Sequence, residues 1–460
     1  MPSIIFKSYS GVLVFKTEQF KAQRFFSSGS TCIKGKKIDY DCISEDNLFY
    51  SEDNHPIASI FSFSYFKKTD EDLSKRPVIF AFNGGPGASS VMLHTALLGP
   101  KRVCYNDDLN SVDSGCVDNA EWLLDIADIV LVDPVGTGFG TLLDKQYASS
   151  FYGIKEDAEA FVAFVEMWLE RYGRYSSPKY IIAESYGCAR AAMALEIASG
   201  QGPNRCYDIS FEGVVFIGNT ISDGKYFNVD HCIPLDQWVA EARNFANSEY
   251  LLALNKGYFI SKGEKDEVVS KIMHFTGVDK KYLLERNLRI DSYSVKNEIL
   301  GKKGLCVSRL DGRIVRELFQ LASDESLYGV SSDRARGLYN PLFMVTLIDS
   351  IFPLIGIKNF NRLYISQFKI SSEWNKSLDL SLSKCLEKVM KRNSSIQFYF
   401  ANGYFDLTTE IGGLEYMLSH TDLDMDRCVY KGYPTGHMVY LGNSELKVFS
   451  SDLRTFIAKC

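Results

Sequence analysis

Paired cysteines are missing from this sequence. Its 11 cysteines among 460 residues are an odd number, are scattered singly and include no C-x-x-C pair. A disulfide framework would favour paired counts, and a zinc site would favour closely spaced pairs. The first residues lack a basic start, an apolar core of signal length and a small-residue cleavage site. We therefore expect mostly free thiols in the cytoplasm, with export by an unrecognised route left open, and neither a metal nor another cofactor.

The sequence also has no block of basic residues and no long apolar run. The net charge is -6, which disfavours nucleic acid and anionic membranes as partners. The longest apolar stretch, Met344 to Ile357, contains Asp349 and Pro353 and is too short to span a bilayer. We interpret it as a buried or pocket-lining segment.

Short apolar runs recur along the chain and alternate with helical patterns. Continuous runs suit strands that are covered on both faces, and they occur at 76–82, 127–133, 179–185, 211–219 and 396–403. A further run at 60–66 alternates aromatic residues with serines, which predicts a half-exposed strand. Because helices lie between the runs, the order predicts an α/β fold with a mainly parallel sheet and helices on both faces.

The alternation stops at about residue 222 and resumes at about residue 373. Between them lie amphipathic helix patterns at 235–254, 268–284 and 311–322, with few strand runs and no low-complexity linker. We therefore predict a core made of residues 1–221 and 373–460, and a helical lid or cap, residues 222–372, inserted into it and packed on it.

One serine stands where a strand ends and a helix begins. The stretch "IIAESYGCARAAM" places Ser185 between small residues, Ala183 and Gly187, at the spacing of a nucleophile elbow. The tight turn needs small neighbours because the strand and helix backbones come close. The alternative is that Ser185 only caps the helix, since short motifs have many false matches.

A serine nucleophile needs a base and an acid that orients the base. In this architecture they follow the serine in the order acid, then histidine, on loops after late strands. Asp406 lies just past the run "IQFYF", and His437 lies in the loop "YPTGHMVY". Taken singly, each could be an ordinary loop residue. Another of the six histidines, His94, lies on an apolar helix face and is interpreted as a core residue.

A glycine-rich loop, "NGGPGASS", follows an earlier strand. Consecutive glycines expose backbone N–H groups because no side chain blocks the approach of a reacting carbonyl. We predict that the N–H groups of Gly85 and Tyr186 form an oxyanion hole, the second because it opens the helix after the serine. The loop lacks the Gly-Lys-Ser/Thr ending of a phosphate-binding loop.

Taken together, these segments resemble the serine carboxypeptidase family, its bacterial branch in particular. The resemblance runs in order through "RPVIFAFNGGPGASSVMLHTALLGPKRV", "VLVDPVGTGFG", "YIIAESYG", "FTGVDKKYLLERNLRI", "VSRLDGR", "FANGYFDLTTEIGGLEYMLSH" and "YPTGHMVYL", from about residue 36 to 460. It implies an α/β-hydrolase fold with a helical cap, a peptide substrate that loses its C-terminal residue through an acyl-enzyme, and a possible homodimer, since relatives include dimers.

The resemblance assigns roles to single residues. It makes Ser185 the nucleophile, His437 the base and Asp406 the orienting acid. Asn83 and Glu184, with Gly84 beside them, match positions that hold the substrate's terminal carboxylate. Glu184 could hydrogen-bond a carboxylate only when protonated, because two ionised carboxylates repel each other.

The sequence departs from the family pattern beside this subsite. Leu97 stands where members that work at acid pH place a second glutamate, hydrogen-bonded to the first. Ala81 replaces a frequent tryptophan, and Ala88 replaces a cysteine. These departures leave the preference for a free C-terminal carboxylate and the pH optimum open.

Two other functions stay open at this point. Plant relatives act as acyltransferases, so the acyl group could pass to an alcohol or amine instead of water, or the enzyme could act as an esterase. The chain could also be a silent binding protein on a hydrolase scaffold, although the presence of Ser185, Asp406 and His437 argues against this.

Overall fold

The computed structural model describes residues 20–105, 109, 115–200, 209–221, 235–290, 295–317, 333–358, 362–378 and 381–459. At its centre is a 10-stranded sheet in the order β1-β2-β3-β7-β4-β9-β10-β13-β14, with β8 (Thr141–Leu142) paired to β3. The other strands are β1 (Arg24–Ile33), β2 (Lys36–Tyr50), β3 (Pro56–Lys67), β4 (Val78–Phe82), β7 (Asp128–Asp133), β9 (Lys179–Glu184), β10 (Gly213–Ile217), β13 (Gln397–Gly403) and β14 (Cys428–Tyr433).

The strands from β7 to β14 in this order run parallel to one another, while β1, β2 and β3 form an antiparallel flank. All five continuous apolar runs contain strands of the parallel part, as the sequence predicts. Their alternate side chains enter two separate hydrophobic clusters, as expected for a sheet covered on both faces.

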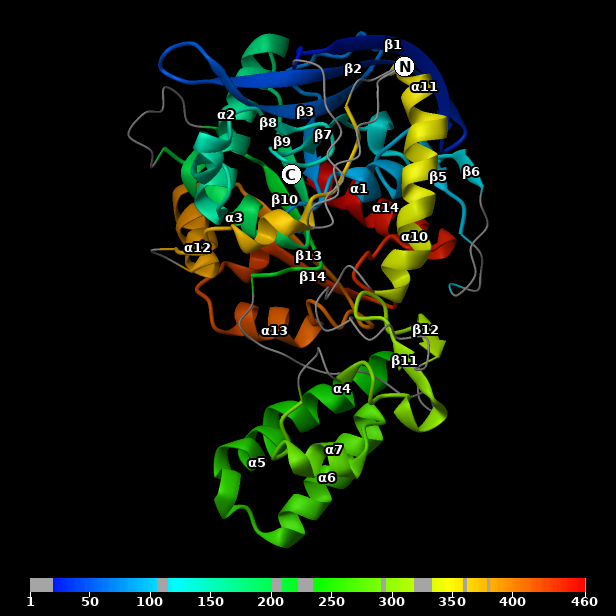
Figure 1. Cartoon of the computed structure of the whole chain (residues 1–460), viewed down its shortest axis with the longest axis vertical. Helices are drawn as coiled ribbons and strands as arrows, with labels where there is room; N and C mark the ends of the chain where they lie inside the picture. The colour runs from blue at the N-terminus through cyan, green and yellow to red at the C-terminus, as the bar shows by residue number, and fades with distance from the viewer. Residues whose placement is uncertain are drawn as a thin grey trace, which may run out of the picture.

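Helices cover both faces (Figure 1). The cluster on one face includes residues of α1 (Val91–Ala96), α10 (Arg334–Val345) and α14 (Asn443–Lys459). The cluster on the other face includes residues of α2 (Ile154–Tyr172), α3 (Tyr186–Ala198), α12 (Leu382–Arg392) and α13 (Ile411–Ser419). The predicted arrangement of helices on both faces is therefore confirmed.

The strand predicted at 60–66 exists, but its predicted half-exposure is wrong. Every residue from Ile57 to Tyr65 is buried, Ser62 and Ser64 included. The indole N–H of Trp168 on α2 donates to the Ser64 hydroxyl at 2.9 Å, and the Asn47 amide donates to the Ser62 hydroxyl at 3.0 Å. The strand with alternating serines and aromatic residues is therefore covered on both faces. On one face the serine hydroxyls accept hydrogen bonds from buried donors.

The segment between β10 and β13 contains two differently packed parts. The first, α4 (Leu235–Phe245), α5 (Leu251–Lys256), α6 (Lys262–Thr276) and α7 (Lys280–Glu285), has a hydrophobic cluster of its own and protrudes from the body (Figure 1). We call it the protruding cap. The second part is a helix from Arg334 to Leu354, which ends in α11 (Phe352–Leu354). The boundaries 222 and 372 stay a prediction.

The helix Arg334–Leu354 is long and apolar enough, by length and composition alone, to cross a membrane. One side of it is nevertheless buried in the core of the body through Tyr339, Phe343 and Leu347. This spacing of four residues is that of an amphipathic helix lying on a protein surface. Within the predicted segment 344–357, Leu347, Ile351 and Ile355 are buried, whereas Val345, Ile348 and Leu354 are exposed, so the segment is buried along one side only.

The helix predicted at 311–322 is wrong where the structure describes it. Val315–Glu317 forms strand β12, which pairs antiparallel with β11 (Leu305–Val307). Asp311 holds the turn between them, because its carboxylate accepts from the Arg313 backbone N–H at 3.0 Å and from the Arg313 guanidinium. Residues 318–322 lie outside the described residues.

Candidate active site

Ser185 occupies a strained turn between β9 and α3. Its φ is 58° and its ψ is -128°, a conformation that side-chain-bearing residues rarely adopt. Its backbone N–H donates to the Ile217 carbonyl at 2.8 Å, which ties the turn to the end of β10. A Cβ at Gly187 would lie 3.0 Å from the Phe82 ring, so packing favours glycine two positions after the serine. This is the geometry of a nucleophile elbow.

Asp406 and His437 form a buried pair on the loops after β13 and β14. The His437 Nδ1 atom lies 2.7 Å from the Asp406 Oδ2 atom. The same carboxylate accepts from the backbone N–H groups of Thr408 and Thr409, at 2.7 and 3.0 Å, and from the Thr409 hydroxyl at 2.5 Å. An ionised carboxylate held by these donors keeps the proton of the imidazole on Nδ1 and leaves Nε2 free to act as a base.

The His437 ring lies at the end of the strand next to Ser185. Ile217, the last residue of β10, is paired with Glu184 of β9 on one side and with Ala401 of β13 on the other. Gly218 follows, and a Cβ there would lie 2.8 Å from two atoms of the His437 ring. The ring therefore covers Gly218, one strand away from Ser185.

Among the described residues, no hydrogen bond joins the Ser185 hydroxyl to His437. Such bonds are often long in free enzymes and tighten when substrate binds. The structure thus joins two of the three predicted catalytic residues directly and brings the third to the same end of the sheet.

The charged groups around His437 are mostly negative. Burial alone would lower the pKa of His437, but the charge of Asp406, its hydrogen bond and the charge of Glu184 raise that pKa overall, against an opposing effect of Arg309. The site therefore favours the protonated imidazole, the form that the base adopts after it accepts a proton.

The glycine loop packs backbone to backbone against the elbow. A Cβ at Gly84 would lie 2.5 Å from the Tyr186 nitrogen, so only glycine fits there. Gly85 follows with a φ of 107°. This places the two predicted oxyanion donors, the N–H groups of Gly85 and Tyr186, on adjoining segments. Tyr186 opens α3, where the N–H groups of the first turn have no partner within the helix.

Two hydrogen bonds fix the side chain of Tyr186. Its hydroxyl donates to Asp157 at 3.0 Å and accepts from the Trp374 indole at 2.9 Å. Arg190 donates to the same Asp157 at 2.7 Å and to the Asn83 carbonyl at 3.0 Å. This buried network connects α2, α3 and the glycine loop, and it fixes the position of the loop relative to the elbow.

The residues predicted to hold a substrate carboxylate lie beneath the site. The Asn83 side-chain amide donates to Glu184 Oε1 at 2.8 Å, and the Tyr440 hydroxyl donates to Glu184 Oε2 at 2.5 Å. Burial raises the pKa of Glu184 overall, against the opposing effects of the His437 charge and of these two donors. Leu97, in place of a second glutamate, is fully buried in the core.

The sequence did not single out three residues of this site, Gly218, Thr409 and Tyr440. Gly218 ends an apolar run, which is a signal for a close approach of two backbones or a ring. Thr409 and Tyr440 each lie three residues from a predicted catalytic residue, but that spacing alone does not show that their hydroxyls turn toward the site.

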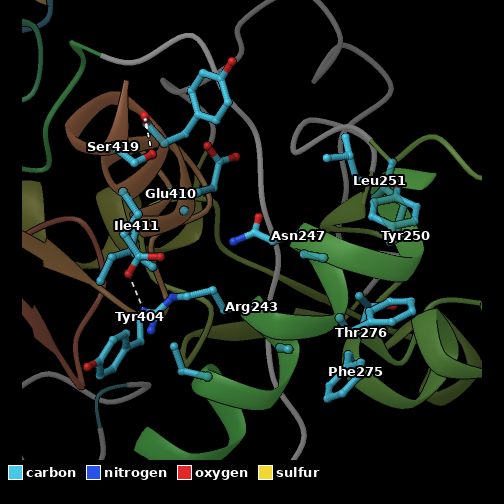
Figure 2. Close-up of a pocket in the computed structure, with 18 of the residues that line it drawn as sticks. Arg243, Asn247, Tyr250, Leu251, Phe275, Thr276, Tyr404, Glu410, Ile411 and Ser419 are labelled. Atoms are coloured by element: carbon cyan, nitrogen blue, oxygen red, sulfur yellow. Dashed lines mark hydrogen bonds and ion pairs between the residues drawn. The ribbon is translucent and has the colours of Figure 1, made fainter. Parts of the chain in front are cut away.

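A cavity of about 570 Å³ separates the protruding cap from α13 (Figure 2). The cap contributes Arg243, Tyr250 and Phe275, and the body contributes the Asp406 loop and α13. The Arg243 guanidinium and the Tyr430 hydroxyl both donate to Glu415 at this boundary. The cavity thus borders the loop of the catalytic acid from the side of the cap.

The sheet, the elbow serine and the Asp406–His437 pair define a serine hydrolase of the α/β-hydrolase fold. The family profile of the serine carboxypeptidases matches residues 56–306, more than half of the chain, and the chain belongs to this family.

Curated relatives match over a shorter region. "Serine carboxypeptidase-like 33" of Arabidopsis thaliana is 31% identical over 195 residues, which are 40% of this chain and 38% of the relative. "Serine carboxypeptidase-like 5" of the same plant is 30% identical over 166 residues, 35% of this chain and 36% of the relative. The matched region is therefore well under half the length of these relatives. Because they are plant proteins, the bacterial branch stays a prediction.

A solved structure shares the fold over nearly its whole length. The crystal structure of Kex1(delta)p, a prohormone-processing carboxypeptidase from Saccharomyces cerevisiae, matches with a TM-score of 0.55 at 12% identity, and covers 91% of this chain and 92% of that one. At this identity the likeness shows the fold alone.

Proposed function

We propose that this protein is a serine carboxypeptidase that releases the C-terminal residue of peptides through an acyl-enzyme. The observation that carries the proposal is the 2.7 Å contact between His437 and Asp406, held at the sheet end where Ser185 occupies its strained turn. Membership of the serine carboxypeptidase family supports the reaction class.

In the proposed first half-reaction, the Ser185 hydroxyl oxygen attacks the carbonyl carbon of the last peptide bond. His437 Nε2 accepts the hydroxyl proton, and the oxyanion that forms accepts hydrogen bonds from the Gly85 and Tyr186 N–H groups. His437 then gives the proton to the leaving amine, the C–N bond breaks, and the C-terminal residue departs. Ser185 is left as an ester of the remaining peptide.

In the second half-reaction, water replaces the departed amine. His437 removes a proton from the water, whose oxygen attacks the ester carbonyl and again forms an oxyanion. The proton returns to the Ser185 oxygen as the ester bond breaks. The shortened peptide leaves, and Asp406 orients the imidazole throughout.

Digestion of a mixed peptide library, read by mass spectrometry, tests the proposal. We expect products one C-terminal residue shorter than their parents, and no such products from Ser185→Ala. Internal cleavage would contradict the carboxypeptidase activity. Parallel reactions of an acyl ester with added alcohols or amines measure transfer, and products of transfer in place of hydrolysis would favour the acyltransferase function.

We also propose that the protein works in a reducing compartment. The eight cysteines that the structure describes are all free thiols, and half of them, Cys42, Cys188, Cys306 and Cys385, are buried. Burial raises the pKa of Cys188 beneath the elbow, which disfavours its reactive thiolate form. Titration of the native protein with a thiol reagent, before and after reduction, would test for disulfides in the remaining cysteines as well.

A further inference from the structure

The turn between β11 and β12, residues 308–314, contacts both loops that carry the catalytic pair. We call it the β11–β12 turn. Its Leu310 carbonyl accepts from the His437 backbone N–H at 2.6 Å, and its Arg309 carbonyl accepts from the backbone N–H of Leu407, next to Asp406, at 2.9 Å. Consecutive carbonyl groups of one short turn thus hold the histidine and the loop of the acid.

A second pair of contacts repeats this double attachment. The Gly312 backbone N–H donates to the Phe405 carbonyl at 2.9 Å. A Cβ at Gly436 would lie 2.4 Å from the Leu310 carbonyl oxygen, so this loop approaches the turn with bare backbone. The β11–β12 turn is therefore held against the residue immediately before each member of the catalytic pair.

A buried cluster of hydrogen bonds fixes the shape of the turn. The Ser308 hydroxyl donates to Asp333 Oδ1 at 2.5 Å, and it accepts from the backbone N–H groups of Leu310 and Asp311, both at 3.1 Å. Asp333 Oδ2 accepts from the Arg309 N–H at 2.7 Å. The exposed fractions of Ser308 and Asp333 are 2% and 5%, and hydrogen bonds buried in this way are stronger than those exposed to water.

Asp333 connects the turn to the body of the protein. It is the N-cap of α10, and its carboxylate accepts from the Ala335 backbone N–H at 3.0 Å. Helix α10 packs through Tyr339 and Phe343 into a hydrophobic cluster that it shares with the sheet. The carbonyl groups that hold the catalytic loops are thus fixed by a helix that packs against the sheet.

The catalytic pair depends on support of this kind. Asp406 and His437 come from loops after different strands, β13 and β14, and their 2.7 Å contact requires that the two loops keep their relative position. Residues 307–313, "VSRLDGR", are among the segments that resemble the family, but the proposed reaction gives them no role. Their contacts place them where they can align the two loops.

We propose that Ser308 and Asp333 are positioning residues, which keep the catalytic pair aligned through the β11–β12 turn. The inference rests on the proposed acyl-enzyme reaction, in which His437 is the base. It gives one part of the inserted segment, which was predicted to be a lid or cap, a role in the geometry of the catalytic pair.

Three variants test the inference: Ser308→Ala, Asp333→Asn and the control Ser177→Ala. Ser177 is 1% exposed, and its hydroxyl also donates and accepts, to the Leu73 carbonyl and from Arg174, both at 2.7 Å. It precedes β9, at the opposite end of this strand from the nucleophile. Thermal unfolding of each variant separates loss of stability from loss of function. Should Ser308→Ala fail to fold, Asp333→Asn carries the test.

The first readout is the NMR signal of the His437 Nδ1–H proton. Its chemical shift depends on the length of the hydrogen bond to Asp406, and His437→Gln identifies the signal. We expect the signal to move upfield in Ser308→Ala and in Asp333→Asn, because the two loops separate and the bond lengthens, and to stay in place in the control. An unchanged signal in both variants overturns the inference.

The second readout is the division of the effect between kcat and KM for a peptide substrate. We expect Ser308→Ala to lower kcat about tenfold and to leave KM unchanged, since small misplacements of catalytic groups have effects of this size or larger. The control should keep its kcat even if it loses as much stability. A raised KM with an unchanged kcat would overturn the inference, because the turn would then act in substrate binding. Wild-type protein that cleaves no peptide would instead contradict the proposed function, because the NMR readout does not need turnover.

Discussion

At the scale of single residues, the site depends on where side chains are absent as much as on where they are present. Gly218 has a φ of 56°, and the His437 ring occupies the space that a Cβ would need. Ser185 also has a positive φ, 58°, but carries a side chain, and the elbow points its hydroxyl out of the turn. The two residues lie at neighbouring strand ends, where one supplies the nucleophile and the other makes room for its base.

Substituting Gly218 tests this arrangement. We expect Gly218→Ala to displace the imidazole and to lower kcat/KM by about 100-fold, since a misplacement near 1 Å has effects of this size. Gly173→Ala is the matched control, because Gly173 has a φ of 62° and nothing within 4 Å of the added Cβ. The control should lose stability through backbone strain and keep its activity. Equal activity in the two variants would contradict the account.

The same scale explains which site residues the sequence could predict. Ser185, Asp406 and His437 belong to local patterns, a small-residue elbow and two loops after apolar runs, so each could be found without knowing the fold. Tyr440 and Gly218 could not, because their roles depend on how β9, β10, β13 and β14 align. Alignment of strands far apart in the sequence is a tertiary property that a single sequence does not display.

At the scale of elements, the short helix α1 links the glycine loop to the core. Its Leu93 N–H donates to Asn83 at 3.1 Å, and the Ser90 N–H before it donates to Asp133 at 2.8 Å. On the same helix, His94 contacts the Tyr65 hydroxyl at 2.6 Å, and its Nδ1 atom has no hydrogen-bond partner among the described residues. His94 is buried in the core, as expected, although only one of its two ring nitrogens has a hydrogen-bond partner among the described residues.

This buried histidine predicts a loss of stability in acid. Burial lowers the pKa of His94 from 6.5 to about 3, so below pH 6.5 the unfolded chain binds a proton that the folded chain does not. The contribution of His94 to the free energy of unfolding is fully present above pH 6.5. It decreases as the pH falls to about 3, by up to about 1.4 kcal/mol per pH unit. Denaturant unfolding at pH 7 and pH 5 should show a smaller difference for His94→Gln than for the wild type.

The matched control for this prediction is the exposed His55. His55→Gln should reproduce the wild-type difference between pH 7 and pH 5. The prediction fails if His94→Gln also does so.

Secondary structure was predicted well where strands are continuous apolar runs and less well where polar side chains take part in the packing. The parallel strands are covered on both faces and read as continuous apolar runs. The strand at 60–66 was found but assigned the wrong exposure, because its hydroxyls meet donors from α2 and β2. Strand β12 was mistaken for part of a helix because its pairing with β11 depends on a turn held by Asp311 and Arg313.

At the scale of the whole molecule, the buried hydrophobic residues that the structure describes form three clusters, two against the sheet and one inside the protruding cap. The cap cluster includes Tyr250, Val269, Ile272 and Leu283 and is separate from the other two. At the boundary, the Arg243–Glu415 ion pair joins α4 to α13 beside the cavity (Figure 2). A part with its own core can open without unfolding the sheet.

Hydrogen exchange followed by mass spectrometry tests this independence. We expect the amides of α6 and α7 to exchange together, and at a lower opening free energy than those of β9 and β10. Arg243→Ala should leave the exchange of the sheet unchanged and speed that of α4. Exchange of cap and sheet amides at one common rate would show that they open as a single unit.

The central claim is that Ser185 is the nucleophile of an acyl-transfer site. Its most direct test is peptide mapping of the protein after reaction with a fluorophosphonate. We predict a single covalent adduct on the peptide that contains Ser185, absent in Ser185→Ala and strongly slowed in His437→Gln. An adduct on another residue, or no adduct on a correctly folded wild-type protein, would contradict the account.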